Sequence, residues 1–172
     1  MKTSTLLWLL LVIVLSPHVV SATDNAAAYR FDKMINGQKI SVVLEVGPFN
    51  AGAHRVKHVS ISAGYRVDSE RPIGNDGDTE ARTEFRRFEV YWNDKKVPLQ
   101  RRAYSAIFNV PLSPIERLGT NDRGFAIIPS IDGSSLLFHF RPNTGASEPE
   151  EAWLVVDRSG IWRKFHSWEL GQ

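Results

Sequence analysis

The chain of 172 residues contains no cysteine. This absence excludes disulfide-stapled scaffolds, thiolate metal centres and cysteine nucleophiles. Such staples are not required here, because a domain of about 150 residues can bury enough apolar surface to be stable without them. The chain also lacks an Asn-x-Ser/Thr acceptor for N-glycosylation. Both absences are compatible with a protein of the bacterial envelope and fit a eukaryotic secreted protein less well.

Recognisable catalytic motifs are missing as well. The sequence has no Gly-x-Ser-x-Gly nucleophile elbow. His54 and His58 would share one face of a helix, but on a strand residues with this spacing lie about 13 Å apart, too far to bind one metal ion. We therefore predict no zinc site. We interpret these two histidines, together with His139 and His166, as surface or strand-face residues.

A long apolar run occurs in one place, Leu6–Leu15, where it follows Lys2 and precedes small residues that end at Ala22. This is the pattern of a secretory signal peptide cleaved after Ala22. The run is too short to be a membrane span, which needs about 20 apolar residues. We therefore predict a signal peptide over residues 1–22. Residues 23–172 are then one exported, soluble domain, periplasmic or extracellular, without a membrane span.

Neither sign of charge is in marked excess. The chain has 21 Lys and Arg against 19 Asp and Glu. The most basic stretch, residues 82–102, has acidic side chains interleaved with its basic ones, which is typical of a solvated strand face. Nucleic-acid binders instead present a continuous basic stripe. We therefore predict no nucleic-acid partner.

The pattern of apolar residues has a period of two, which indicates β-strands. The clearest example is a hairpin in which Asn36-Gly37 separates strands over residues 29–35 and 38–46. Pairing across this turn places Phe31 opposite Val42 and keeps the apolar side chains on one face, as a half-buried hairpin requires.

Further strands are predicted along the rest of the chain. One runs over residues 55–67 with a bulge near 57–58, and two hairpins turn at Asp94-Lys95 and Asp132-Gly133. In the second of these hairpins Phe125 faces Phe140, and Pro129 falls on a hydrogen-bonding position. The remaining strands are expected over residues 103–110, 153–156 and 161–168.

This pattern predicts an all-β fold, an antiparallel β-sandwich of eight or nine short strands. At most one short helical turn is expected, near residues 113–119. There Ser113-Pro114-Ile115-Glu116 forms a capping box with proline in the first helical position.

Aromatic residues gather in the last two predicted strands and supply one candidate binding site. Trp153, Trp162 and Trp168 could stack on sugar rings or peptide side chains. In a sandwich such residues more often fill the core. Both interpretations remain open from the sequence, and these three tryptophans are the predicted ligand-binding residues.

The polar loop over residues 75–80 is the best candidate for a metal site. Asp76, Asp78 and Glu80 offer the hard oxygen ligands that calcium prefers, in a segment where glycine permits a tight turn. The segment does not match the EF-hand order, and loops of this composition also form for turn reasons alone. Calcium is therefore an option here, and no other cofactor is predicted.

The function suggested by these features is an exported binding or interaction module without catalysis of its own. Its partner would be a protein or a glycan in the cell envelope or outside the cell. One alternative is a glycan-active enzyme that uses a carboxylate pair drawn from Asp76, Glu84 and Glu89. Another is a structural domain stabilised by calcium.

Overall fold

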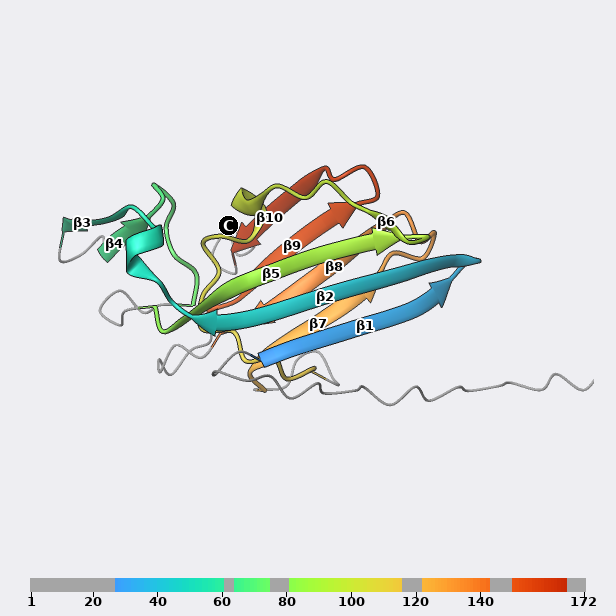
Figure 1. The fold of residues 1–172 in the computed structure, drawn as a ribbon, viewed down its shortest axis with the longest axis horizontal. Coiled ribbons are helices and arrows are strands. Elements are labelled where there is room, and N and C mark those ends of the chain that lie inside the picture. The colour runs from blue at the N-terminus through green and yellow to red at the C-terminus, as the bar shows by residue number, and fades with distance from the viewer. Residues whose placement is uncertain (1–26, 61–63, 75–80, 116–121, 143–149, 167–172) are drawn as a thin grey trace, which may run out of the picture.

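The computed structural model describes residues 27–60, 64–74, 81–115, 122–142 and 150–166. These residues form ten strands and two short 3₁₀ turns, and the predicted all-β fold is confirmed (Figure 1). The strands are β1 (Ala27–Ile35), β2 (Gln38–Pro48), β3 (Val56–Ser60), β4 (Gly64–Val67), β5 (Thr83–Trp92), β6 (Lys95–Lys96), β7 (Gly124–Pro129), β8 (Ser135–Arg141), β9 (Ala152–Asp157) and β10 (Trp162–His166). The 3₁₀ turns are η1 (Ala51–Ala53) and η2 (Arg101–Ala103).

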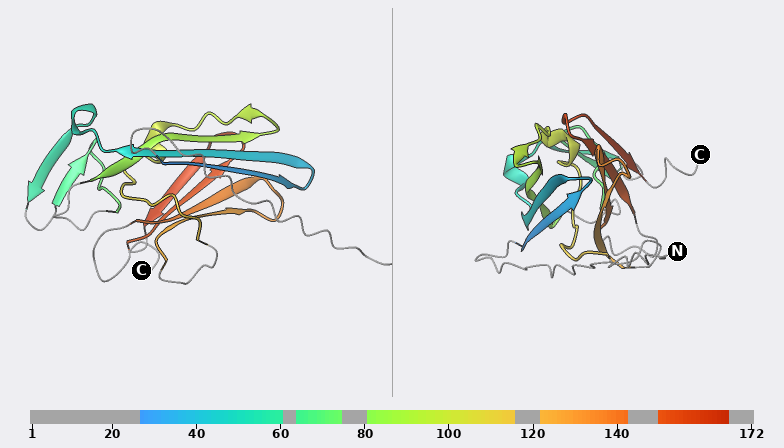
Figure 2. Two further views of the ribbon diagram at one scale, coloured as in Figure 1. Left: turned by 60° about the horizontal axis from the view of Figure 1, so that its bottom comes forward. Right: turned by 90° about the vertical axis from the view of Figure 1, so that its right-hand side faces the viewer.

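The strands form two four-stranded antiparallel sheets and one separate hairpin. The first sheet has the order β1-β2-β5-β6 and the second the order β10-β9-β8-β7, whereas β3 pairs only with β4. Figure 2 shows the two larger sheets in separate layers, with β3 and β4 beyond one end of them. We call the two four-stranded sheets the body of the molecule.

The core of the body lies between the two sheets. Alternate side chains of each strand point inward, and those of Phe138 and Phe140 on β8 are completely buried. Rings from the two sheets meet edge to face, with centroids 4.9 Å apart for Phe88–Phe138 and 5.4 Å apart for Phe85–Phe140. Aromatic packing therefore joins the layers.

The register predicted for the first hairpin is confirmed. Ile35 pairs with Gln38 and Phe31 pairs with Val42. The two turn residues Asn36 and Gly37 have φ angles of 49° and 75°, the left-handed conformation that this tight turn demands.

The register predicted for the β7–β8 hairpin is also confirmed, since Phe125 pairs with Phe140. The expectation for Pro129 was wrong. The backbone N of Ser130 donates to the O of Ser135 at 2.9 Å, so these two residues form a hydrogen-bonded pair. Hydrogen-bonded and non-hydrogen-bonded pairs alternate along an antiparallel ladder, and the next pair, Pro129 with Leu136, is therefore a non-hydrogen-bonded one. Because β7 is an edge strand, the nitrogen of Pro129 points away from β8 and removes no ladder bond.

Two details of the strand prediction were wrong. Residues 55–67 fold back on themselves as β3 and β4, with Val56 paired to Val67, rather than forming one strand. The expected bulge does occur there, between His58 and Ser60. The hairpin after β5 turns at Asn93-Asp94, both left-handed, so Trp92 pairs with Lys95 instead of Val97.

The segment after η2 differs from its predicted structure. Residues 103–110 make turns and isolated bridges instead of a strand, because their polar groups bind neighbouring loops. Ser113–Ile115 are extended and bridge to Phe125, so the predicted helical turn does not begin at Ser113. The rest of that predicted turn lies outside the described residues. In the parts of the chain that the structure describes, no helix has the length and apolar character of a membrane span.

Candidate functional site

The hairpin at one end of the molecule, with the turns on either side of it, carries the candidate site. We call residues 49–70 the arm; they comprise η1, β3, β4 and the turn that follows (Figure 1). Its contact with the body contains few apolar side chains. Val67 packs with Phe108 and Ala81, and Phe49 lies against this cluster. Apolar burial under the arm is therefore small.

A buried histidine completes the base of the arm. His54 follows η1, a turn that is capped by a bond from the backbone N of Gly52 to the side chain of Asn50. The His54 side chain is only 1% exposed. Its Nε2 lies 2.5 Å from Oε2 of Glu84 on β5, and its Nδ1 lies 2.7 Å from Oδ2 of Asp68 after β4. Phe49 stacks on the ring with centroids 5.1 Å apart.

Both ring nitrogens of His54 thus face carboxylate oxygens. A neutral imidazole carries one N–H, so two such contacts need a second proton, either on the ring or on a carboxyl group. Glu84, itself only 3% exposed, also lies 3.1 Å from Nη1 of Arg86. Charges of both signs therefore compensate one another inside this contact.

Asp68 links the buried histidine to the surface of the arm. Its Oδ1 accepts a 2.9 Å hydrogen bond from the backbone N of Arg55, while its Oδ2 faces His54. Burial alone would raise the pKa of Asp68, but these two hydrogen bonds outweigh it, and the pKa lies below its usual value. Asp68 is therefore charged at neutral pH and fixes the start of β3.

We call the Glu84–His54–Asp68 contact the clamp. Its histidine and glutamate side chains are almost fully buried. The two carboxylates lie at opposite nitrogens of the ring and cannot converge on one ion. Consistent with this, the described residues contain no group of three or more His, Asp or Glu side chains placed to bind a metal.

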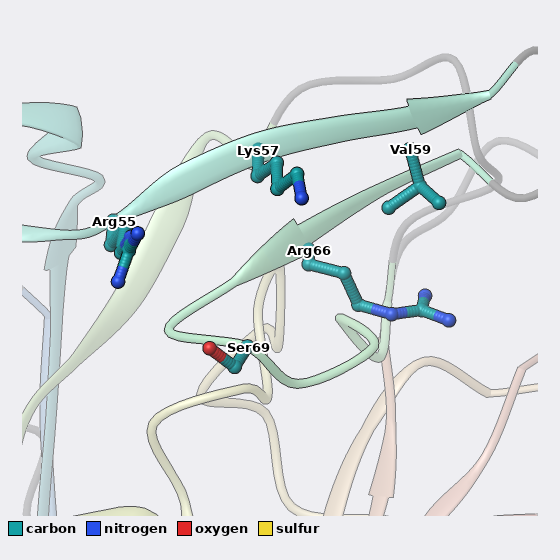
Figure 3. A pocket seen from close by; sticks show the side chains of 5 residues that line it. All are labelled: Arg55, Lys57, Val59, Arg66 and Ser69. Atoms are coloured by element: carbon teal, nitrogen blue, oxygen red, sulfur yellow. The ribbon is translucent and has the colours of Figure 1, made fainter.

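A cleft of about 290 Å³ lies on one face of the arm. Arg55, Lys57 and Val59 line it because they alternate along β3 and so share one face. Arg66 joins them as the cross-strand partner of Lys57. Ser69, in the left-handed turn after β4, completes the lining (Figure 3).

The cleft is electrostatically one-sided. Of the five described residues that line it, three are cationic and none is acidic. Among the described residues, no ion pair involves Arg55, Lys57 or Arg66. Nη1 of Arg66 is also buried without a hydrogen-bond partner in the described part of the chain. A buried donor without a partner costs about 1–3 kcal/mol, which a bound acceptor would offset.

The tryptophans predicted as a binding platform lie on different sides of their sheet. Trp162 pairs with the fully buried Val156 and packs against the core, whereas Trp153 lies on the outer face. Trp153 stacks on His139 with centroids 3.7 Å apart and an interplanar angle of 7°. The two therefore cannot form one platform. A binding role for Trp153 alone stays a prediction, and Trp168 lies outside the described residues.

The outer-face histidine belongs to a second polar cluster. Nε2 of His139 lies 3.1 Å from Glu151, whose other oxygen lies 3.0 Å from Nε of Arg141. Burial lowers the pKa of His139 even though Glu151 opposes this effect. His139 is therefore neutral at physiological pH and serves as a flat, buried support for Trp153.

The other predicted site residues give little support to a catalytic carboxylate pair. Glu84 is engaged in the clamp. Burial raises the pKa of Glu89, but hydrogen bonds from Lys96, Arg87 and Tyr91 outweigh this effect and lower it to about 2. A glycosidase acid requires a raised pKa instead. Asp76, Asp78 and Glu80 lie outside the described residues, so calcium binding there stays a prediction.

Most residues of this site could not be predicted from the sequence. His54 was expected on the surface and is buried. The alternation of Arg55 and Lys57 was visible and does place both on one face. Arg66 joins them only because the chain reverses direction after β3, and no strong turn pattern in the sequence predicts this reversal.

Comparison with known proteins adds nothing to this picture. No protein-family model matches the chain, and no curated protein or solved structure is similar to it. What the arm binds is therefore inferred from its own geometry and charge.

Proposed function

We propose that this protein is an exported binding module, without catalysis of its own, that holds an anionic group of its partner in the cationic cleft of the arm. The observation that carries this proposal is the lining of the cleft, in which Arg55, Lys57 and Arg66 face one space with no acidic side chain among the described lining residues. Unneutralised cations that converge in this way repel one another, and a bound anion removes that repulsion.

The chemistry of the lining favours carboxylate, sulfate or phosphate groups. A guanidinium presents a planar fork of N–H donors that matches such oxyanions, and a lysine ammonium adds a flexible point charge. Arg66 is the best placed of the three, because its buried Nη1 still lacks an acceptor among the described residues. The hydroxyl of Ser69 is a further donor at the same cleft.

Binding at the arm also fits the absence of an accessible reactive centre in the described residues. The buried contact of His54 with Glu84 and Asp68 lies beneath the arm and holds it in place. The clamp thus supports a recognition surface. A binding module needs such support, because side chains bind best when the backbone beneath them is fixed.

Titration with pyrophosphate and with citrate, followed by backbone amide NMR shifts of the protein recovered from cells that express the full chain, tests the proposal. We expect the shifts to cluster at Arg55, Lys57, Arg66 and Ser69 and to weaken as salt is raised, because the Debye length falls from about 8 Å at physiological ionic strength.

Two charge-reversal variants distinguish anion binding at the cleft from nonspecific attraction to the positive charges of the protein. Lys57→Glu should lower the affinity for both anions about tenfold or more, since it places a like charge beside the ligand. Lys95→Glu is the matched control, because Lys95 is an exposed strand lysine on β6 of the body. Equal losses in the two variants, or shifts spread over the body, would contradict the proposal.

A further inference from the structure

The two edges of the arm's small sheet differ. On the β4 side, Val67 bonds reciprocally to Glu70, with N–O distances of 3.0 and 2.9 Å, so the following turn covers that edge. On the other side β3 has no neighbouring strand in the described residues. Figures 1 and 2 both place β3 at the outermost end of the molecule. The arm therefore has one covered edge and one open edge.

The backbone groups at the open edge follow from the register. Asp68 N donates to Arg55 O at 3.0 Å, so Arg55 and Asp68 form a hydrogen-bonded pair. Because hydrogen-bonded and non-hydrogen-bonded pairs alternate, the next pair, Val56 with Val67, is a non-hydrogen-bonded one. The N–H and C=O of Val56 consequently point away from β4. In the body, the edge strand β7 is protected at the corresponding kind of position by Pro129 and by its bridge to residues 113–115. The β3 edge lacks such protection in the described residues.

Apolar side chains are exposed on the same strand. Val56 is 41% exposed and Val59 is 50% exposed. The alternation of the strand places them on opposite faces, and Val59 shares the cationic face with Arg55 and Lys57. A neighbouring strand would cover both valines and bring its own side chains beside the cations.

We infer that the partner is a protein and that an extended acidic segment of it adds as a third strand to the open edge of β3; this rests on the proposed function. Alternate residues of a strand lie about 6.6–6.8 Å apart. Asp or Glu at every second position of the incoming segment therefore matches the spacing of Arg55 and Lys57. A polysaccharide could neutralise the same cations, but it would leave the backbone edge and the valines uncovered.

Strand addition also matches the stability of the arm. An isolated two-stranded hairpin is marginal in water, and a third strand supplies the missing backbone hydrogen bonds. Main-chain pairing provides affinity in this mode, and the alternating carboxylates provide specificity. Binding should consequently slow amide hydrogen exchange along the arm more than in the body.

The test measures the affinity of a short peptide that alternates Glu and Val, labelled for fluorescence anisotropy. Two further peptides of the same sequence carry N-methyl groups on one or the other alternating set of residues, which blocks pairing along one edge. At least one methylated peptide should bind about tenfold more weakly or worse. If both bind as tightly as the parent, strand addition is wrong.

A protein variant gives the matching result from the other side. Val56→Pro removes the outward N–H without touching the ladder to β4, as Pro129 does on β7. It should lose the peptide and keep pyrophosphate binding. The methylated peptides decide the question alone if this variant does not fold, because they leave the protein unchanged.

The outcomes separate this inference from the proposed function. If pyrophosphate binds at the cleft but N-methylation of the peptide does not weaken its binding, strand addition is wrong and the proposed function stands. Absence of all anion binding at the cleft overturns both. Polygalacturonate that binds more tightly than the peptide, and equally well to Val56→Pro, identifies a glycan partner and also overturns the strand.

Discussion

The body and the arm are held by different forces. In the body, aromatic and aliphatic side chains from two sheets interlock, and Phe88 alone contacts Phe85, Tyr104, Phe138 and Phe140. The arm has a small apolar cluster around Val67 and a buried charged contact at His54. The stabilisation from apolar packing is non-directional and scales with the buried area. The stabilisation from the clamp depends instead on the protonation of its groups and on its hydrogen-bond distances.

This difference assigns separate roles to the two regions. A large shared core makes the body a cooperative unit, and loss of any part of it is felt throughout. The arm has fewer buried apolar contacts, so its local opening should cost less free energy than global unfolding. A recognition edge on such an element can be ordered by its partner without any change in the body.

The largest expected effect comes from breaking the body. Phe88→Ala deletes a ring between the sheets, where Phe88 is 4% exposed. It should lower the free energy of unfolding by about 3–5 kcal/mol, from lost transfer energy and the cavity left behind. Urea denaturation measures this loss. Ile131→Ala, at a side chain that is 100% exposed, is the control and should change stability by at most about 0.5 kcal/mol. Similar losses in both variants would contradict a core centred on Phe88.

The second effect is intermediate in size and local to the arm. His54→Ala leaves the buried Glu84 carboxylate without its closest partner, which costs about 3 kcal/mol by analogy with other broken buried pairs. Amide hydrogen exchange should accelerate at Val67 and Asp68, whose N–H groups donate to Glu70 O and Arg55 O, and stay unchanged at Val90 in the body.

A control on the same hairpin sharpens this result. Lys57→Ala removes an exposed arm side chain that lies outside the clamp, and it should leave exchange at Val67 and Asp68 unchanged. If His54→Ala accelerated amide exchange at Val90 as much as in the arm, the arm and the body would open together. The proposed difference in local stability between them would then be wrong.

The body could be predicted from the sequence to a greater extent than the arm. Turns such as Asn36-Gly37 and Asp132-Gly133 fix the register of their hairpins through local chemistry, and both registers are confirmed. The prediction failed where a distant partner decides the conformation. Asn109 has a φ of 55° because its side chain accepts from the backbone nitrogens of Arg82 and Thr83. An apolar pattern there resembled a strand.

The same reason explains what was missed at the site. The two contacts of His54 join residues 14 and 30 positions away, and no local pattern encodes such pairs. The shared face of Arg55 and Lys57 needed only the period of a strand and was therefore accessible. Arg66 required knowledge that β4 returns beside β3.

The smallest expected effect concerns pH and the surface end of the clamp. Asp68 has a folded-state pKa below its usual 3.8, so its charge stabilises the arm above that pH, and this contribution is lost as pH falls through the lowered value. Because the side chain is 41% exposed, the contribution is at most about 1 kcal/mol. Asp68→Asn should accordingly speed exchange modestly at pH 6 at Val67, whose N–H donates to Glu70 O.

Acidification should then erase this difference between the wild-type protein and Asp68→Asn, because a protonated carboxyl group and an amide are both uncharged. Exchange is measured with a correction for the intrinsic pH dependence of the amide rate. Asp94→Asn, at an exposed carboxylate on the tip of the β5–β6 hairpin, is the control and should leave exchange at Val67 unaffected at every pH. If the exchange rates of the wild-type protein and Asp68→Asn still differ at a pH below the folded-state pKa of Asp68, hydrogen-bond geometry, and not charge, stabilises the surface end of the clamp.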